Sequence, residues 1–181
     1  MFGRAGKSLV LTALVGMICA LAAPAAAVSE GSVKKLSASQ ALAGQILGQM
    51  NAVRAQHGLG RLRLSARLNA AAAAHSVQMG RRGYFSHNSA DGSAFWKRVQ
   101  RFYRSGGYRF WAVGENLLWS SPGVDAGRAI QMWMNSPPHR ENLLSARWRE
   151  VGLSAVHVSN ARGVFGGHEV TIVTADFGVR H

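Results

Sequence analysis

The chain of 181 residues carries 21 Lys and Arg against 8 Asp and Glu, a formal net charge of +13 at pH 7. Its length is that of one domain, and its single cysteine, Cys19, excludes an internal disulfide framework. Positive charge draws a protein toward anionic material, so an anionic cell surface is an expected partner; the alternative is a basic soluble surface with no dedicated partner. A lipid or a peptide is the other expected ligand. Nucleic acid is not expected, because no recognition-helix signature accompanies the arginines.

The first 27 residues have the pattern of a secretory signal peptide. Arg4 and Lys7 supply the positive start, residues 9–22 the apolar run, and residues 25–27 a small-residue cleavage site. The apolar run is shorter than the roughly 20 residues that span a membrane. We therefore expect export to a secreted or periplasmic location and a cysteine-free, monomeric product.

The exported chain is expected to consist of a leader segment, 28–41, and a single domain, 42–178. Ser37 and Gln40 have the spacing of a capping box, in which each side chain satisfies an otherwise unpaired backbone amide. They predict the start of a first helix, whose apolar residues recur at helical spacing until Gly58 offers a left-handed stop.

Three more helices are predicted before the late part of the chain. Ser65 can cap an alanine-rich helix that Gly83 ends, and Asp91 or Ser93 can cap the next. The pair Ser121–Pro122 combines a capping residue with a first-position proline, which predicts the start of a fourth helix.

Alternating apolar residues predict strands at the end of the chain. Residues 151–158 and 170–177 have period two and flank a glycine-rich turn at 163–167, and 115–119 fits a short strand. Helices before and between the strands, with an antiparallel sheet late in the chain, predict an α+β fold.

Four motifs occur in order: YFSH at 84–87, GEN at 114–116, SPPHRENLL at 136–144 and EVG at 150–152. Together they resemble the bacterial branch of the CAP superfamily, the cysteine-rich secretory, antigen 5 and pathogenesis-related proteins with an SCP-like domain. The resemblance covers residues 42–178. It implies an α-β-α sandwich with a central antiparallel sheet flanked by helices, and a shared cavity.

The resemblance assigns four residues to that cavity: His87, Glu115, His139 and Glu150. Such a tetrad can bind a divalent metal through neutral imidazoles, run acid–base hydrolysis, or form a hydrogen-bonded knot without turnover. The intervals match no local metal signature, so the metal expectation rests on the resemblance. We take His87 and His139 as ligands for Zn²⁺ or another divalent cation.

The leading function is therefore a secreted binding or effector module with a metal-capable His/Glu cavity. The alternative is a metal-dependent, protease-like hydrolase that uses Glu115 or Glu150 as base and a metal-held water as attacker. Ser86 and Ser136 adjoin the histidines but have no pattern that predicts a nucleophile.

The motifs depart from the eukaryotic pattern at one position. Serine stands where eukaryotic members have a second glutamate, before His139, so the equivalence of Glu150 with that residue is open. Glu141 competes with Glu150, but two residues beyond His139 on a helical turn it would face away.

Several other polar and aromatic residues are interpreted as structural. His75 lies on the apolar stripe of its helix, and Asn51 and Arg54 match the N-x-x-R of the family's first helix. Tyr84, Phe85 and Trp119 either line an apolar wall for a ligand or belong to the core; we favour the core.

Overall fold

The computed structural model describes residues 30–181, with side chains described from Ser39 onward, so the predicted signal peptide lies outside the described residues. No helix in the described range is both long enough and apolar enough to cross a membrane. The elements, in chain order, are α1 (Glu30–Gln56), β1 (Arg63–Leu64), α2 (Ala66–Arg82), α3 (Phe95–Phe102), β2 (Trp111–Ser120), α4 (Ala126–Met134), α5 (Pro137–Leu144), β3 (Glu150–Ala161), the 3₁₀ turn η1 (Gly163–Phe165) and β4 (His168–Arg180).

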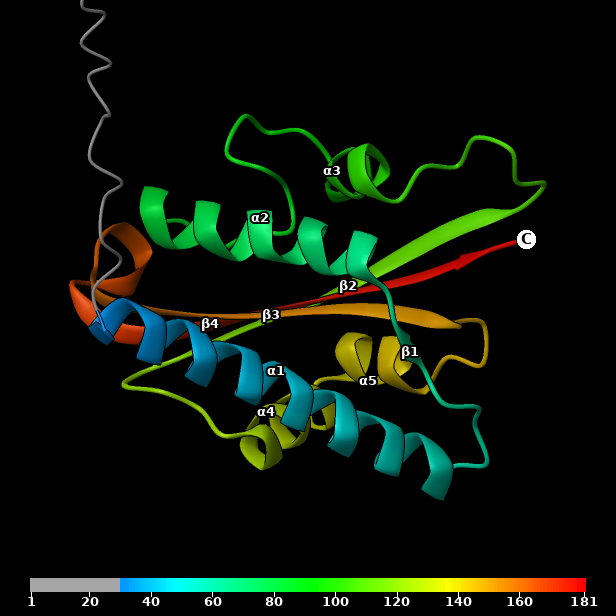
Figure 1. Cartoon of the computed structure of the whole chain (residues 1–181), viewed down its shortest axis with the longest axis horizontal. Coiled ribbons are helices and arrows are strands. Elements are labelled where there is room, and N and C mark those ends of the chain that lie inside the picture. The colour runs from blue at the N-terminus through cyan, green and yellow to red at the C-terminus, as the bar shows by residue number, and fades with distance from the viewer. Residues whose placement is uncertain (1–29) are drawn as a thin grey trace, which may run out of the picture.

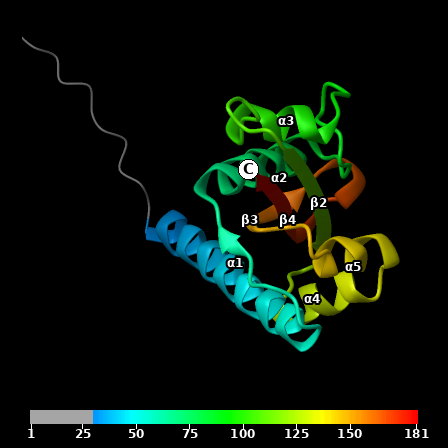
Figure 2. The ribbon, with the colours of Figure 1, turned by 90° about the vertical axis from the view of Figure 1, so that its right-hand side faces the viewer.

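The strands form one sheet in the order β1-β3-β4-β2. β4 pairs antiparallel with both β2 and β3, and β1 adds a two-residue parallel pair with the start of β3. Helices α2 and α3 lie on one side of the sheet and α1, α4 and α5 on the other (Figures 1 and 2). The α+β sandwich expected from the sequence is confirmed, and the parallel β1 pair is the one addition to its antiparallel sheet.

Apolar side chains fill both interfaces of the sandwich. The larger core lies between the sheet and the α1/α4/α5 layer and includes Trp133, Leu143 and Trp148. Leu68 and Val99 pack in the core under α2 and α3. Because the three long strands are covered on both faces, β4 is buried along almost its whole length.

Three predicted helix starts are wrong, beginning with those of the first and fourth helices. The first helix begins at Glu30 and runs through Ser37, because residues 33–36 contain no glycine or proline to prevent helix from extending back beyond the capping box. The fourth helix begins after Asp125, whose carboxylate accepts a hydrogen bond from the Arg128 amide at 2.8 Å. Residues 121–122 therefore precede it.

The predicted third helix also begins later than expected. Its N-cap is Ala94, because the Asp91 carboxylate accepts from the Ser93 amide in a local turn, at 2.9 Å. The second helix follows the prediction: Ser65 is its N-cap and Gly83 its left-handed C-cap. Residue 115 lies in the middle of the longer strand β2.

The N-x-x-R pair of α1 has the structural role expected for it. Asn51 donates to the Leu62 carbonyl at 3.1 Å and accepts from the Leu62 amide at 2.8 Å. Arg54 is buried and donates to the carbonyls of Gly60, Leu143 and Ser145. The pair thus ties the end of α1 to the following link and to the end of α5.

The glycine of the EVG motif allows α2 to touch the sheet. A Cβ at Gly152 would lie 2.0 Å from the backbone carbon of Leu68, whereas a Cβ at Gly48 on α1 would meet nothing within 4 Å.

We expect Gly152→Ala to lower the free energy of unfolding by about 3 kcal/mol or more, since backbone cannot yield as a side chain does. Gly48→Ala should raise it by up to about 1 kcal/mol. Urea unfolding measures both, and equal effects would contradict this packing.

Candidate functional site

The GEN motif lies on edge strand β2 and sends consecutive residues to opposite faces of the sheet. At Gly114 the packing leaves no room for a larger residue, because a Cβ would lie 2.7 Å from the Trp148 ring and 2.9 Å from the Asn142 amide oxygen. Glu115 faces α3, and Asn116 faces α5, where it donates to the His139 carbonyl at 2.8 Å. One short stretch of strand therefore holds both helical layers.

Asn142 on α5 completes the attachment of α5 to the edge strand. Its amide donates to the Glu115 carbonyl at 3.1 Å and to the Asn116 side-chain oxygen at 3.0 Å. Together with the Asn116–His139 hydrogen bond, these contacts fix the first two turns of α5, and so the position of His139, relative to β2.

His87 reaches Glu115 from the loop that follows α2. Its Nδ1 lies 2.7 Å from Glu115 Oε1, and its side chain is 51% exposed whereas that of Glu115 is 1% exposed. Arg98 on α3 contacts the other oxygen of Glu115, Oε2, and donates to the His87 carbonyl at 3.1 Å. Both the ring and the backbone of His87 are therefore held by the buried Arg98–Glu115 pair.

Arg98 is a site residue that the sequence analysis missed. It was counted with the basic surface, yet it is buried on the inner face of α3 beside Val99. A charged residue in register with the apolar positions Phe95, Val99 and Phe102 was the available signal. Arginine suits this position because its planar fork can contact a carboxylate and a carbonyl at once.

Asp176 on β4 is a second missed residue. It stands directly opposite Glu115 in the β2–β4 register and is completely buried. Burial raises the pKa of Asp176 well above its usual value, and the adjacent Glu115 charge raises it further. Burial also raises the pKa of Glu115 to about 7, against the opposing effect of Arg98.

The two carboxyls therefore share one buried site with a single guanidinium. Arg98 and His87 contact Glu115, whereas neither Asp176 oxygen has a hydrogen-bond donor among the described residues. We assign the ionised form to Glu115 and the proton to Asp176, since two adjacent buried carboxylates cannot both be charged at little cost.

His139 lies in the first turn of α5, where Pro137 and Pro138 occupy the first helical positions, which suit proline. It lines a cavity of about 280 Å³, together with Phe85, Trp119 and apolar residues of β2 and α4. Burial lowers the pKa of His139, and His87 in its protonated form lowers it further. Phe85 and Trp119 form the apolar wall of this cavity.

Glu150 is not brought into the group. It begins β3, so β4 lies between it and Glu115, and its carboxylate accepts from the Tyr103 hydroxyl at 2.5 Å. The expected convergence of all four residues in one cleft is therefore corrected: His87 contacts Glu115, His139 lines the cavity between β2 and α5, and Glu150 anchors the end of α3. Glu141 is exposed on α5, as its position on the helical turn indicated.

His75 and Tyr84 lie beneath the site, as the structural interpretation expected. His75 is fully buried, and its Nε2 lies 2.8 Å from the Ser86 carbonyl. Burial, reinforced by the nearby Arg98 charge, lowers the pKa of His75 to about 3, so it is neutral. The Tyr84 hydroxyl donates to Gln78 at 2.5 Å, and its ring meets that of His75 edge-on.

The donor set fits a divalent metal only in part. No group of three or more His, Cys, Asp and Glu side chains able to hold a metal occurs in the part of the chain that the structure describes. The imidazoles of His87 and His139 remain as candidate ligands. Nδ1 of His87 is turned to Glu115, which leaves its Nε2 available to a metal. A metal-binding histidine usually has a carboxylate behind its ring in this way. Protein groups would thus supply two ligands, with solvent or a bound molecule supplying the others.

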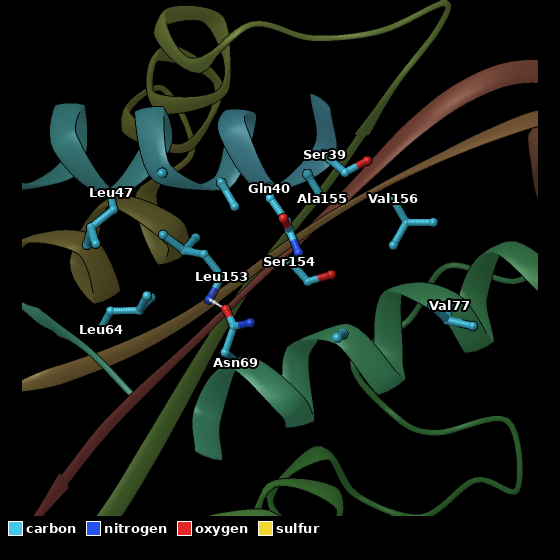
Figure 3. Close-up of a pocket in the computed structure, with 13 residues that line it drawn as sticks. Ser39, Gln40, Leu47, Leu64, Asn69, Val77, Leu153, Ser154, Ala155 and Val156 are labelled. Carbon is cyan, nitrogen blue, oxygen red and sulfur yellow. Dashed lines mark hydrogen bonds between the residues drawn. The ribbon is translucent and has the colours of Figure 1, made fainter. Parts of the chain in front are cut away.

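A separate groove lies between α1 and α2, over the edge of β3 (Figure 3). It encloses about 360 Å³ and is lined by uncharged side chains, including Leu47, Leu64 and Val77. Asn69 reaches across it to accept from the Leu153 amide at 3.1 Å, which satisfies part of the open strand edge. It contains neither imidazole of the site.

The sequence family model described as CAP, the cysteine-rich secretory protein family, matches residues 47–177. The chain belongs to this family. Two Bacillus subtilis proteins resemble its CAP domain. Uncharacterized membrane protein YlbC is 32% identical over 127 residues, which are 70% of this chain and 34% of YlbC. Uncharacterized protein YkwD is 31% identical over 107 residues, 59% of this chain and 39% of YkwD. The chain thus spans well under half the length of either relative.

Solved structures show the same fold. An extracellular SCP-domain protein from Bacillus anthracis has a TM-score of 0.61 and 26% identity, covering 84% of this chain and 44% of that one. An outer surface protein from Borrelia burgdorferi has a TM-score of 0.57 and 18% identity, covering 75% of this chain and 90% of that one. The first is described as an extracellular protein, which fits the expected export, and the second shows the fold alone.

The buried carboxyl pair makes stability depend on pH in a defined direction. A group whose folded pKa is raised stabilises the fold at low pH and loses that contribution as pH rises through the folded value. Between pH 5 and 8, we expect the free energy of unfolding to fall less steeply in Asp176→Asn than in the wild type. The difference should approach about 1.4 kcal/mol per pH unit for one proton.

Urea unfolding at a series of pH values measures this slope, and Asp91→Asn is the control. Asp91 is exposed, and its hydrogen bond from Ser93 lowers its pKa, so its titration is complete below this window. Equal slopes in wild type and Asp176→Asn would show that Asp176 is ionised throughout.

Proposed function

We propose that this CAP domain is an extracytoplasmic binding module whose ligand contacts a divalent metal ion held by His87 and His139. The observation that carries the proposal is the Arg98–Glu115–His87 chain. It orients one imidazole through Nδ1 and leaves its Nε2 unused beside a half-exposed opening. Because the fold already holds the His87 ring in place, binding a metal would cost little further side-chain entropy at this residue.

The surroundings of His139 support a role in binding. Its cavity combines one imidazole with the apolar wall of Phe85 and Trp119, so a ligand with an apolar part and an anionic or carbonyl group matches its chemistry. A bound divalent ion would supply a Lewis-acid contact for that polar group. A lipid or a peptide meets this description.

The hydrolase alternative has weaker support from the geometry. A general base needs a free lone pair within reach of the attacking water. Both oxygens of Glu115 are already engaged by His87 and Arg98, and its side chain is 1% exposed. Glu150 accepts from Tyr103 and lies beyond β4. Assays of peptide and ester hydrolysis with and without chelator separate the two functions, and metal-dependent turnover would favour the hydrolase.

Zinc titration by calorimetry tests the proposal. We expect His87→Ala with His139→Ala to abolish binding. Glu115→Gln should weaken it, since the amide preserves shape but not charge, and circular dichroism checks that this variant is folded although Arg98 has lost its matching charge. His57→Ala is the matched control, because His57 is exposed and its ring contacts only the Val53 carbonyl of its own helix. Burial lowers the pKa of both site imidazoles, so protons should compete with zinc only below about pH 6.5.

If the double variant binds zinc as well as the wild type, the metal proposal is wrong. Zinc would then have to be bound elsewhere, and the other histidines are its candidates: His57, His75, His157, His168 and His181.

A further inference from the structure

Exposed aromatic side chains gather in the segment 96–110, which comprises most of α3 and the loop that leads to β2. Trp96 and Tyr108 are each 43% exposed and Phe110 is 42% exposed. Large aromatic residues are usually buried, so three in one short segment need an explanation. Its α3 part lies on the outer side of α2, and the rest is the loop that runs from α3 to β2 (Figure 1).

The same segment is basic. Its exposed cations are Lys97, Arg101, Arg104 and Arg109, and the sequence contains no acidic residue between Asp91 and Glu115. On α3 the positions of Trp96, Lys97 and Arg101 fall on one side of the helix, opposite the buried Arg98 and Val99, and Arg104 follows just after the helix ends. Exposed aromatic and cationic residues are therefore interspersed along this one segment of the chain.

Local contacts fix part of this surface in place. Arg180 of β4 lies over the Tyr103 ring at 4.0 Å and over the Tyr108 ring at 4.6 Å, which holds the loop. Phe110 pairs through its backbone with His181 and stacks on its ring at 5.1 Å. The exposed rings are thus presented by an ordered segment.

We propose that the segment 96–110 is a membrane-docking surface that binds anionic phospholipid headgroups, with Trp96, Tyr108 and Phe110 entering the interfacial region. Aromatic rings favour the boundary between headgroups and acyl chains, and each Lys or Arg near an anionic surface adds attraction. Single-stranded nucleic acid is the less favoured partner, because it is bound along grooves. None of the cavities at α1–α2, α2–β3 and β2–α5 is lined by residues of this segment. The proposal is independent of the metal site.

Co-sedimentation with vesicles tests it. We expect the wild type to bind phosphatidylglycerol–phosphatidylcholine vesicles far more strongly than phosphatidylcholine alone, with binding that falls as salt rises. Arg101→Gln with Arg104→Gln should weaken binding about thirtyfold, since each cation near an anionic surface contributes about 1 kcal/mol. Arg61→Gln with Arg128→Gln makes the same charge change at exposed positions before β1 and on α4, and should weaken binding less than about threefold.

The aromatic residues distinguish a membrane from a general polyanion. Trp96→Ser with Phe110→Ser should weaken vesicle binding about tenfold or more, whereas Val164→Ser, at a 60% exposed apolar position in η1, should leave it unchanged. Circular dichroism checks that each variant is folded. If the arginine pair matters but the aromatic pair does not, the surface binds polyanions such as nucleic acid and the membrane proposal is wrong. Equal binding by wild type and both double variants would also overturn it.

Discussion

Burial of the Arg98–Glu115–Asp176 group is the constraint on which the rest of this site depends. Removing charged groups from water is costly, and a buried guanidinium is tolerated only when its charge is matched and its donors are used. Here Arg98 contacts Glu115 and two groups of the loop that precedes α3, the His87 carbonyl and, at 3.4 Å, the Ser89 hydroxyl, whereas its Nε has no partner among the described residues. The group therefore joins α3, the His87 loop and the two strands β2 and β4.

This arrangement explains why the GEN motif is short and contiguous. An edge strand alternates its side chains between two faces, so adjacent residues can serve different layers. Glu115 organises the α2/α3 side, Asn116 the α5 side, and Gly114 allows Trp148 and Asn142 to approach. His87 and His139 come from opposite layers and depend on neighbouring residues of one strand. A shift of β2 by one residue would exchange these roles and separate the imidazoles from their supports.

Local patterns in the sequence were enough to predict most of the fold. Capping residues, glycine stops and apolar alternation predicted α2 and the long strands β3 and β4, and the ordered motifs identified the family that the comparisons confirm. Three helix starts were misplaced because good capping residues, Ser37, Ser93 and Ser121, occur where the chain does not use them as caps. The parallel β1 pair depends on a two-residue contact that has no local signature.

The site was predicted less completely, because its decisive contacts are non-local. Glu150 was assigned to the cavity from its place in a motif, but strand order puts β4 between it and Glu115. Asp176 was missed because it lies in a buried strand, where only the cross-strand register reveals that it faces Glu115. Arg98 was hidden among many surface arginines. Register and burial distinguish these residues, and both are properties of the folded chain.

Our central claim is that ionised Glu115, held by Arg98, fixes the ring of His87 with Nε2 free for a ligand. Nitrogen-15 NMR of the His87 imidazole at pH 7.5 tests this most directly, because it reports which ring nitrogen carries the proton. The account predicts a neutral ring protonated at Nδ1, which donates to Glu115 Oε1 at 2.7 Å, and an unprotonated Nε2. A ring protonated at Nε2, with Nδ1 accepting from a protonated Glu115, would contradict it.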